Sequence, residues 1–175
     1  ALTALAMAVN VLLSPWGAVV LIALICVWLL LQHRLVDAVA FGLITAVIWG
    51  SSAVGKVIVA RLRPPAEAVH PLVAETQPDS FPSGHTAFAF ALSVAAFLIL
   101  ARRVDQRWLV AAAGVVFTVG VGLTRIYLGV HYPTDVIGSV LIGSAALLML
   151  LPIWNRVAPR LAQQVSRRVG RPGLR

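Results

Sequence analysis

Long apolar segments alternate along this chain with short clusters of charged residues. Five segments contain no Asp, Glu, Lys or Arg, and they cover residues 1–32, 38–55, 86–101, 108–124 and 136–155. A helix needs about 20 mostly apolar residues to cross the hydrocarbon core of a bilayer, and the last four segments reach this length once their flanks are added. The pattern therefore predicts an all-α integral membrane protein. Four of its spans are expected near residues 37–58, 84–101, 108–128 and 134–154.

The first apolar segment is too long for one crossing and is interrupted by Ser14-Pro15. Proline is favoured in the first turn of a helix, where its missing N–H would have no intrahelical partner. We therefore predict a further span near residues 15–32, preceded by a short apolar helix or truncated span over 1–13. The result is a bundle of five to six transmembrane helices. A cleaved signal peptide is less favoured, because no basic residue precedes the apolar stretch.

The composition agrees with this pattern. Hydrophobic residues make up 60% of the 175 positions and charged residues 11%, against about 45–50% and about 25% in soluble domains. Fourteen Lys and Arg against six Asp and Glu give a net charge of +8, but residues 155–175 contain six arginines and no acid. The sequence thus predicts one transmembrane domain over 1–154 and a basic tail over 155–175. Because the chain is so apolar and so poor in charged residues, no nucleic-acid partner is expected.

The distribution of basic residues predicts the orientation in the membrane, because cytoplasmic loops are enriched in Lys and Arg. Arg34 follows the second apolar helix, Arg102, Arg103 and Arg107 precede the span near 108–128, and the basic tail follows the last span. Placing these three regions in the cytoplasm gives a consistent alternation. The loops near 61–82 and 126–133 then lie on the outer side.

Six ionisable residues lie near the ends of apolar segments, all on the predicted outer side: Lys56, Arg63, His85, Arg125, His131 and Asp135. Ionisable groups at membrane depth are costly and by default indicate function. Snorkelling to the headgroups explains a single Lys or Arg, but it does not explain six such groups on one side. Lys56 and Arg63 are close to two helical turns apart, so they share a face if the helix continues to Pro64.

Residues 82–85 read Pro-Ser-Gly-His and precede an apolar run. Ser83 is a candidate N-cap, and Gly84 allows a ligand to approach the backbone closely. The free N–H groups and the positive end of a helix dipole favour an anion there, facing His85. A plain capped helix start explains these four residues, taken alone, equally well.

The last group combines Arg125 with His131 and Asp135, which are four residues apart across Pro133. A carboxylate on one imidazole nitrogen fixes the tautomer and leaves the other nitrogen free as a nucleophile or base. A lone His–Asp pair is often structural, but a neighbouring arginine favours the handling of an anion.

Together the three groups resemble the signature of the type 2 phosphatidic acid phosphatase (PAP2) superfamily, which also includes the vanadium-dependent haloperoxidases. The matching blocks are Lys56-x6-Arg63-Pro64, Pro82-Ser83-Gly84-His85 and Thr124-Arg125-x5-His131-x3-Asp135. One departure is Thr124, where the family usually has Ser, and the hydroxyl is kept. The resemblance implies a helical core of the PAP2/haloperoxidase type.

The resemblance also implies a role for each residue. His131 would attack phosphorus to form a phosphohistidine, Asp135 would orient it, and His85 would protonate the leaving oxygen. The phosphate oxygens would be held by Lys56, Arg63, Arg125, Ser83 and Gly84. Because fixed cations and a helix N-terminus can neutralise the transferring group, no metal and no other cofactor is expected.

The implied function is metal-independent hydrolysis of a lipid phosphate or diphosphate at the outer face of the bacterial cytoplasmic membrane. Polyprenyl diphosphates such as undecaprenyl diphosphate, phosphatidylglycerophosphate and phosphatidic acid all fit. A vanadate-dependent oxidoreductase and a non-catalytic lipid-binding or transport protein remain as alternatives. The residues His70, Glu67, Glu75 and Asp79 of the long loop are candidates for shaping headgroup selection, but most of them are expected to be solvated. Arg61 receives no role.

Overall fold

The protein is described by a computed structural model that covers residues 1–75, 77–101 and 103–168. Helices dominate this part of the chain, and its only β pairing is an isolated bridge between Leu62 and Asp79. The predicted all-α class is therefore confirmed. The helices are α1 (Leu2–Leu12), α2 (Pro15–Leu31), α3 (Leu35–Val59), α4 (Ala66–Val69), α5 (Gly84–Ala95) with a π-helical extension (Ala96–Leu100), α6 (Val104–Tyr127) and α7 (Pro133–Arg168).

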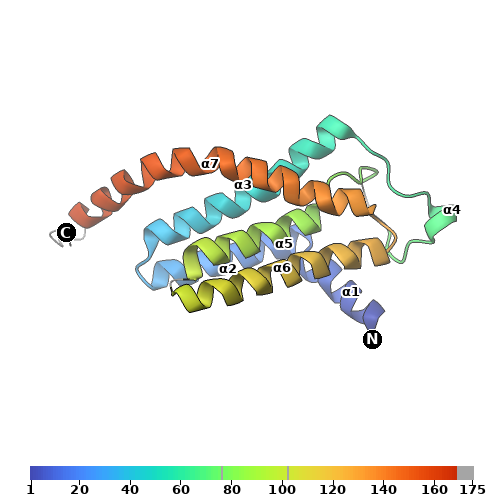
Figure 1. The fold of residues 1–175 in the computed structure, drawn as a ribbon, viewed down its shortest axis with the longest axis horizontal. Helices are drawn as coiled ribbons and strands as arrows, with labels where there is room; N and C mark the ends of the chain where they lie inside the picture. The colour runs from blue at the N-terminus through green and yellow to red at the C-terminus, as the bar shows by residue number, and fades with distance from the viewer. Residues whose placement is uncertain (76, 102, 169–175) are drawn as a thin grey trace.

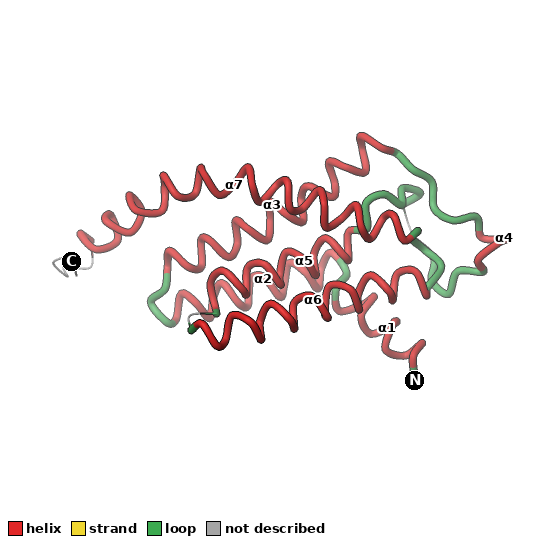
Figure 2. Tube along the Cα trace, viewed as in Figure 1, coloured by secondary structure: helices red, strands yellow, loops and turns green. Residues whose placement is uncertain are grey.

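The long helices run side by side along the long axis of the molecule (Figure 1). Helix α5 packs against α3 and α6, and α7 packs against α3. The longest loop, which carries α4, lies at one end of the bundle, and the short α2–α3 connection lies at the other end (Figure 2). The two ends of the bundle therefore differ sharply: one has little more than tight turns, and the other has an elaborate polar loop.

Within the described residues, three helices are long and apolar enough to cross a membrane, namely α3, α6 and α7. The pair α1–α2, bent by 67°, makes a possible fourth span. The segment Gly84–Leu100 is apolar but shorter. The membrane class is thus confirmed, whereas the predicted count of five to six spans is not. Helix α7 continues beyond the predicted span end at 154, so the tail begins as helix. Arg102 and residues 169–175 of the predicted tail lie outside the described residues.

The break at Ser14-Pro15 forms as predicted. Pro15 occupies the first turn of α2, and the Ser14 side chain caps the helix by accepting a hydrogen bond from the backbone N–H of Gly17 at 3.3 Å. The cap satisfies a backbone donor that has no carbonyl partner within the helix. Helix α1 is thereby turned away from α2 and packs on α6 instead.

The helix that would place Lys56 and Arg63 on one face does not continue to Pro64. Helix α3 ends at Val59, because Ala60 adopts a left-handed conformation with φ 45°. The chain then becomes extended, and its two arms pair: Arg63 N–H donates to the Pro78 carbonyl at 3.2 Å, and Ser80 N–H donates to the Arg61 carbonyl at 2.7 Å. In extended backbone residues i and i+2 point to the same side, so Arg61 and Arg63 are directed together rather than around a helix.

Candidate active site

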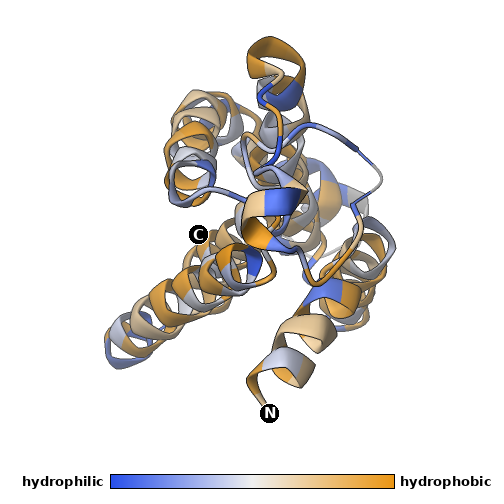
Figure 3. Cartoon of the chain, turned by 90° about the vertical axis from the view of Figure 1, so that its right-hand side faces the viewer, coloured by the Kyte–Doolittle hydropathy of each residue, from blue (hydrophilic) through white to orange (hydrophobic). Residues whose placement is uncertain are grey.

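The three sequence blocks meet at one end of the bundle. The last turn of α3, the first turn of α5, the last turn of α6 and the start of α7 all lie beneath the long loop (Figure 1). Seen towards this end, hydrophilic positions cluster at the loop and helix ends, whereas the helix bodies are mostly hydrophobic (Figure 3). A cavity of about 200 Å³ opens here. Its polar lining residues are Lys56, Arg63, Glu75, Gln77, Gly84, His85 and His131.

His131 and Asp135 form the predicted pair. The Nδ1 atom of His131 lies 3.2 Å from Oδ2 of Asp135, and the backbone N–H of Tyr132 donates to the same oxygen at 2.9 Å. Both side chains are buried, with 3% and 0% exposure. With the proton on Nδ1, Nε2 carries the lone pair that a nucleophile or base requires.

Burial and neighbouring positive charges change the pKa of His131. Its Nε2 lies 3.4 Å from Nη1 of Arg63. Burial lowers the pKa of His131 below its usual 6.5, the hydrogen bond to Asp135 raises it, and the charges of Arg63 and Arg125 lower it further. The net effect is a lowered pKa, which keeps the imidazole neutral and nucleophilic at physiological pH.

Arg61, which had no predicted role, contacts the same pair from the outside. Its Nη1 donates to Oδ1 of Asp135 at 3.2 Å and to Oγ1 of Thr134 at 2.6 Å, and its guanidinium stacks 4.0 Å above the ring of Tyr132. Asp135 therefore holds the histidine with one oxygen and an arginine with the other. The sequence signal was the Arg61-x-Arg63 spacing, which places both on one side only if the segment is extended.

The three predicted phosphate-binding cations occupy different depths. Lys56 donates to the Asp79 carbonyl at 2.6 Å. Arg63 donates to the carbonyls of Gln77 and Val130, at 2.8 Å each. Arg125 is fully buried, and its Nε has no hydrogen-bond partner among the described residues. A buried donor without a partner is costly and calls for an acceptor.

Glu75 is an exception to the expectation that most polar residues of the long loop are solvated. Its Oε2 lies 3.3 Å from Nη2 of Arg63, and its Oε1 accepts a hydrogen bond from Nη2 of Arg125. A carboxylate thus bridges two of the three cations expected to hold phosphate. No local sequence signal distinguished Glu75 from the other loop acids, because its partners lie far away in the chain.

The N-terminal helix also reaches the site. The side-chain oxygen of Asn10 in α1 accepts from Nη1 of Arg125 at 2.5 Å, and the Asn10 carbonyl lies 3.2 Å from Nε2 of His85. Sequence reasoning missed Asn10, although a lone amide in an uncharged apolar segment was an available signal. The predicted resemblance to the family did not cover this helix, yet it holds two of the predicted site residues.

Ser83 caps α5 as predicted: its buried Oγ accepts from the backbone N–H of Thr86 at 3.4 Å. The neighbouring Gly84 and His85 face the cavity, whereas Ser83 is not among its lining residues. The Ser83 carbonyl accepts from Oγ of Ser139 at 2.9 Å, and its N–H donates to the Asp135 carbonyl at 3.3 Å. These bonds tie the start of α5 to the start of α7.

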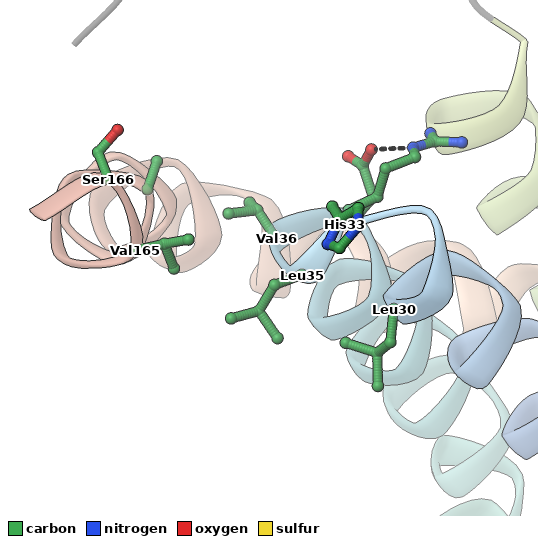
Figure 4. Close-up of a pocket in the computed structure, with 9 residues that line it drawn as sticks. Leu30, His33, Leu35, Val36, Val165 and Ser166 are labelled. Atoms are coloured by element: carbon green, nitrogen blue, oxygen red, sulfur yellow. Dashed lines mark hydrogen bonds and ion pairs between the residues drawn. The ribbon is translucent and has the colours of Figure 1, made fainter. Parts of the chain in front are cut away.

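A larger cavity of about 710 Å³ lies at the opposite end, between the α2–α3 turn and the last turns of α7 (Figure 4). Val165 and Ser166 of α7 line this space together with His33 of the turn, and the Arg34–Asp37 ion pair at 2.7 Å borders it (Figure 4). None of the predicted site residues lines it. The described residues contain no group of three or more His, Cys, Asp or Glu placed to hold a metal ion.

Fold and site together define a helical membrane protein in which a cluster of cationic side chains lies next to an oriented histidine. The PAP2 superfamily matches residues 34–158, and the chain therefore belongs to this superfamily. The chain is also similar to the crystal structure of a transmembrane PAP2-type phosphatidylglycerolphosphate phosphatase from Bacillus subtilis. The match has a TM-score of 0.54 and 27% identity, and it covers 89% of this chain and 85% of that chain.

Curated relatives give shorter matches. The chain is 39% identical over 77 residues to undecaprenyl-diphosphatase BcrC of Bacillus subtilis, covering 44% of this chain and 36% of BcrC. It is 36% identical over 104 residues to an undecaprenyl-diphosphatase of Sulfolobus acidocaldarius, covering 58% of this chain and 46% of the relative. The match thus spans less than half the length of these relatives. The predicted family is confirmed.

Proposed function

We propose that this protein hydrolyses a lipid phosphate or diphosphate in the membrane. The observation that carries the proposal is the convergence of a carboxylate-oriented His131 with Arg63, Lys56 and His85 on one cavity of about 200 Å³. Membership of the PAP2 superfamily and the names of the relatives support a phosphatase.

In the proposed reaction Nε2 of His131 attacks phosphorus, forming an N–P bond as the P–O bond to the leaving group breaks. His85 gives its proton to the leaving oxygen. It then takes a proton from water, which attacks the phosphohistidine and releases inorganic phosphate. Phosphoryl transfer needs mainly positioning and charge neutralisation. Lys56, Arg63 and Arg125 supply that charge, so we propose that no metal ion is needed.

A lipid substrate is supported by the apolar surroundings of the site. A groove of about 740 Å³ runs between α3 and α7 and reaches Gly55, the neighbour of Lys56. Among the relatives, those named for undecaprenyl diphosphate support a polyprenyl diphosphate, and the structural match supports phosphatidylglycerolphosphate as a second candidate. We propose a polyprenyl diphosphate as the substrate.

We further propose that the site faces the outside of a bacterial cytoplasmic membrane, with α7 ending in the cytoplasm. Cys26 is the only cysteine, so a Cys26→Ala background allows single labels. An impermeant maleimide is expected to label Glu67→Cys in intact cells and Arg160→Cys only after permeabilisation. The reverse labelling pattern would overturn this orientation.

The test of function is phosphate release from a panel of lipid phosphates by the purified protein in detergent and EDTA. We expect release from at least one polyprenyl diphosphate, and loss of that release in His131→Ala. The control is His33→Ala, the same change at the opposite end of the bundle. If the intact protein releases phosphate from no lipid, the proposal fails. Activity that requires added Mg²⁺ would refute only its metal independence.

A further inference from the structure

A negatively charged side chain lies inside the proposed phosphate site. Glu75 lines the cavity together with Lys56, His85 and His131. Its two carboxylate oxygens contact different arginines, Oε2 with Arg63 and Oε1 with Arg125. The carboxylate thus bridges two guanidinium groups on the loop and on α6.

Phosphate and carboxylate oxygens compete for the same arginine donors, because both accept charge-assisted hydrogen bonds from guanidinium N–H groups. Arg125 has 0% side-chain exposure, and its Nη1 is already bonded to Asn10. Arg125 is therefore held in place by Asn10 and Glu75. A phosphate that takes the position between Arg63 and Arg125 must displace the Glu75 carboxylate from it.

The position of Glu75 also has a physical reason. A buried cation is costly unless an opposite charge compensates it, and Glu75, with 22% exposure, supplies that charge to Arg125. Glu75 belongs to the non-helical part of the long loop. It can therefore leave the arginines without breaking a helical hydrogen bond.

We propose that Glu75 occupies the phosphate position as an internal anion, and that phosphate groups enter and leave the site by exchange with it. This inference rests on the proposed function, in which Arg63 and Arg125 hold phosphate oxygens. Exchange weakens the binding of every phosphate by the same factor. The site therefore holds inorganic phosphate weakly, and exchange with Glu75 favours the release of this product.

The test measures binding of inorganic phosphate to the purified protein by calorimetry, which needs no turnover. Glu75→Gln keeps the shape and removes the charge, and we expect it to bind phosphate about tenfold more tightly or better. Glu75→Asp keeps the charge and is expected to stay near the unmodified protein. Glu67→Gln, the same change at an exposed position of the same loop, is the matched control and should leave the affinity unchanged.

A second readout protects the test against a folding defect. Glu75→Gln is expected to show a larger phosphate-induced rise in thermal midpoint than the unmodified protein, whatever its midpoint without phosphate. Equal or weaker phosphate binding by Glu75→Gln would overturn the inference and leave the proposed function standing. If neither the unmodified protein nor Glu75→Gln binds phosphate, the phosphate site itself is refuted, and the proposed function falls with it.

Discussion

Gly55 approaches Pro82 so closely that a side chain at this position has no room. A Cβ atom on Gly55 would lie 2.8 Å from Cδ and 3.1 Å from Cγ of Pro82. Carbon atoms in contact are best separated by about 3.5–4.0 Å, so Gly55→Ala requires a shift of about 0.7 Å. Pro82 is fully buried, and its ring cannot rotate away from the backbone.

The shift should move groups of the site, because Gly55 and Pro82 are the direct chain neighbours of Lys56 and Ser83. Overpacking costs about 1–3 kcal/mol, which the higher helix propensity of alanine offsets by about 1 kcal/mol. We therefore expect a small loss of stability, at most about 2 kcal/mol. The effect on catalysis should be larger, since a displacement of about 1 Å can slow an enzyme by about a hundredfold.

The assay compares kcat/KM for lipid phosphate hydrolysis and the thermal midpoint of Gly55→Ala with those of Gly50→Ala. Gly50 lies on the same helix, and a Cβ there meets nothing within 4 Å. We expect Gly50→Ala to retain full activity and Gly55→Ala to lose about ten- to a hundredfold in kcat/KM. Unchanged kcat/KM in Gly55→Ala would refute the argument that this contact sets the position of the α3 end.

Three further predictions follow from the contacts of the site. Because the pKa of His131 is lowered, the acid limb of the pH profile of kcat/KM should lie below pH 6.5. Arg63→Gln removes a cation that repels the protonated imidazole, so it should move the acid limb to higher pH. A shift of the acid limb to lower pH would contradict this assignment. Arg61→Ala should lower kcat more than it raises KM, and Arg61→Lys should recover part of the lost kcat. Equal activity of the two variants would show that the positive charge at position 61 is unimportant. Asn10→Leu leaves a buried donor of Arg125 unpaired, at a cost of about 1–3 kcal/mol, and should lower the thermal midpoint. The control Asn155→Leu, at an exposed position, should leave the midpoint unchanged. Equal midpoints of the two variants would refute the role of Asn10 in stabilising Arg125.

The helices and the chemistry of this protein are local properties of its sequence. Each apolar segment predicts a helix because partition into lipid depends on the segment itself. Ser14 and Ser83 predict helix starts because a capping bond spans only a few residues. The spacing of His131 and Asp135 likewise brings the pair together within a single turn. For these features no knowledge of the remaining chain was needed.

Long-range contacts were decided only by the tertiary structure. Arg125 is paired by Asn10, 115 positions away, and by Glu75, 50 positions away. The same loop contains several acidic residues, and the sequence does not show which of them pairs with Arg125. The structure shows that Glu75 does, because only a carboxylate close to a buried charge can compensate it. The end of α3 at Ala60 also depends on the paired arms of the loop, which turn Arg61 and Arg63 towards α7.

The sequence by itself therefore determined the membrane class, the family and the residues to which the proposed chemistry is assigned. Only the tertiary structure decided which charged side chains pair with each other. The physical reason is that motif spacing reports on a few neighbouring turns, whereas the pairing of buried charges depends on which distant segments are packed against each other. In this protein that packing places an acidic side chain where the sequence predicts only cations.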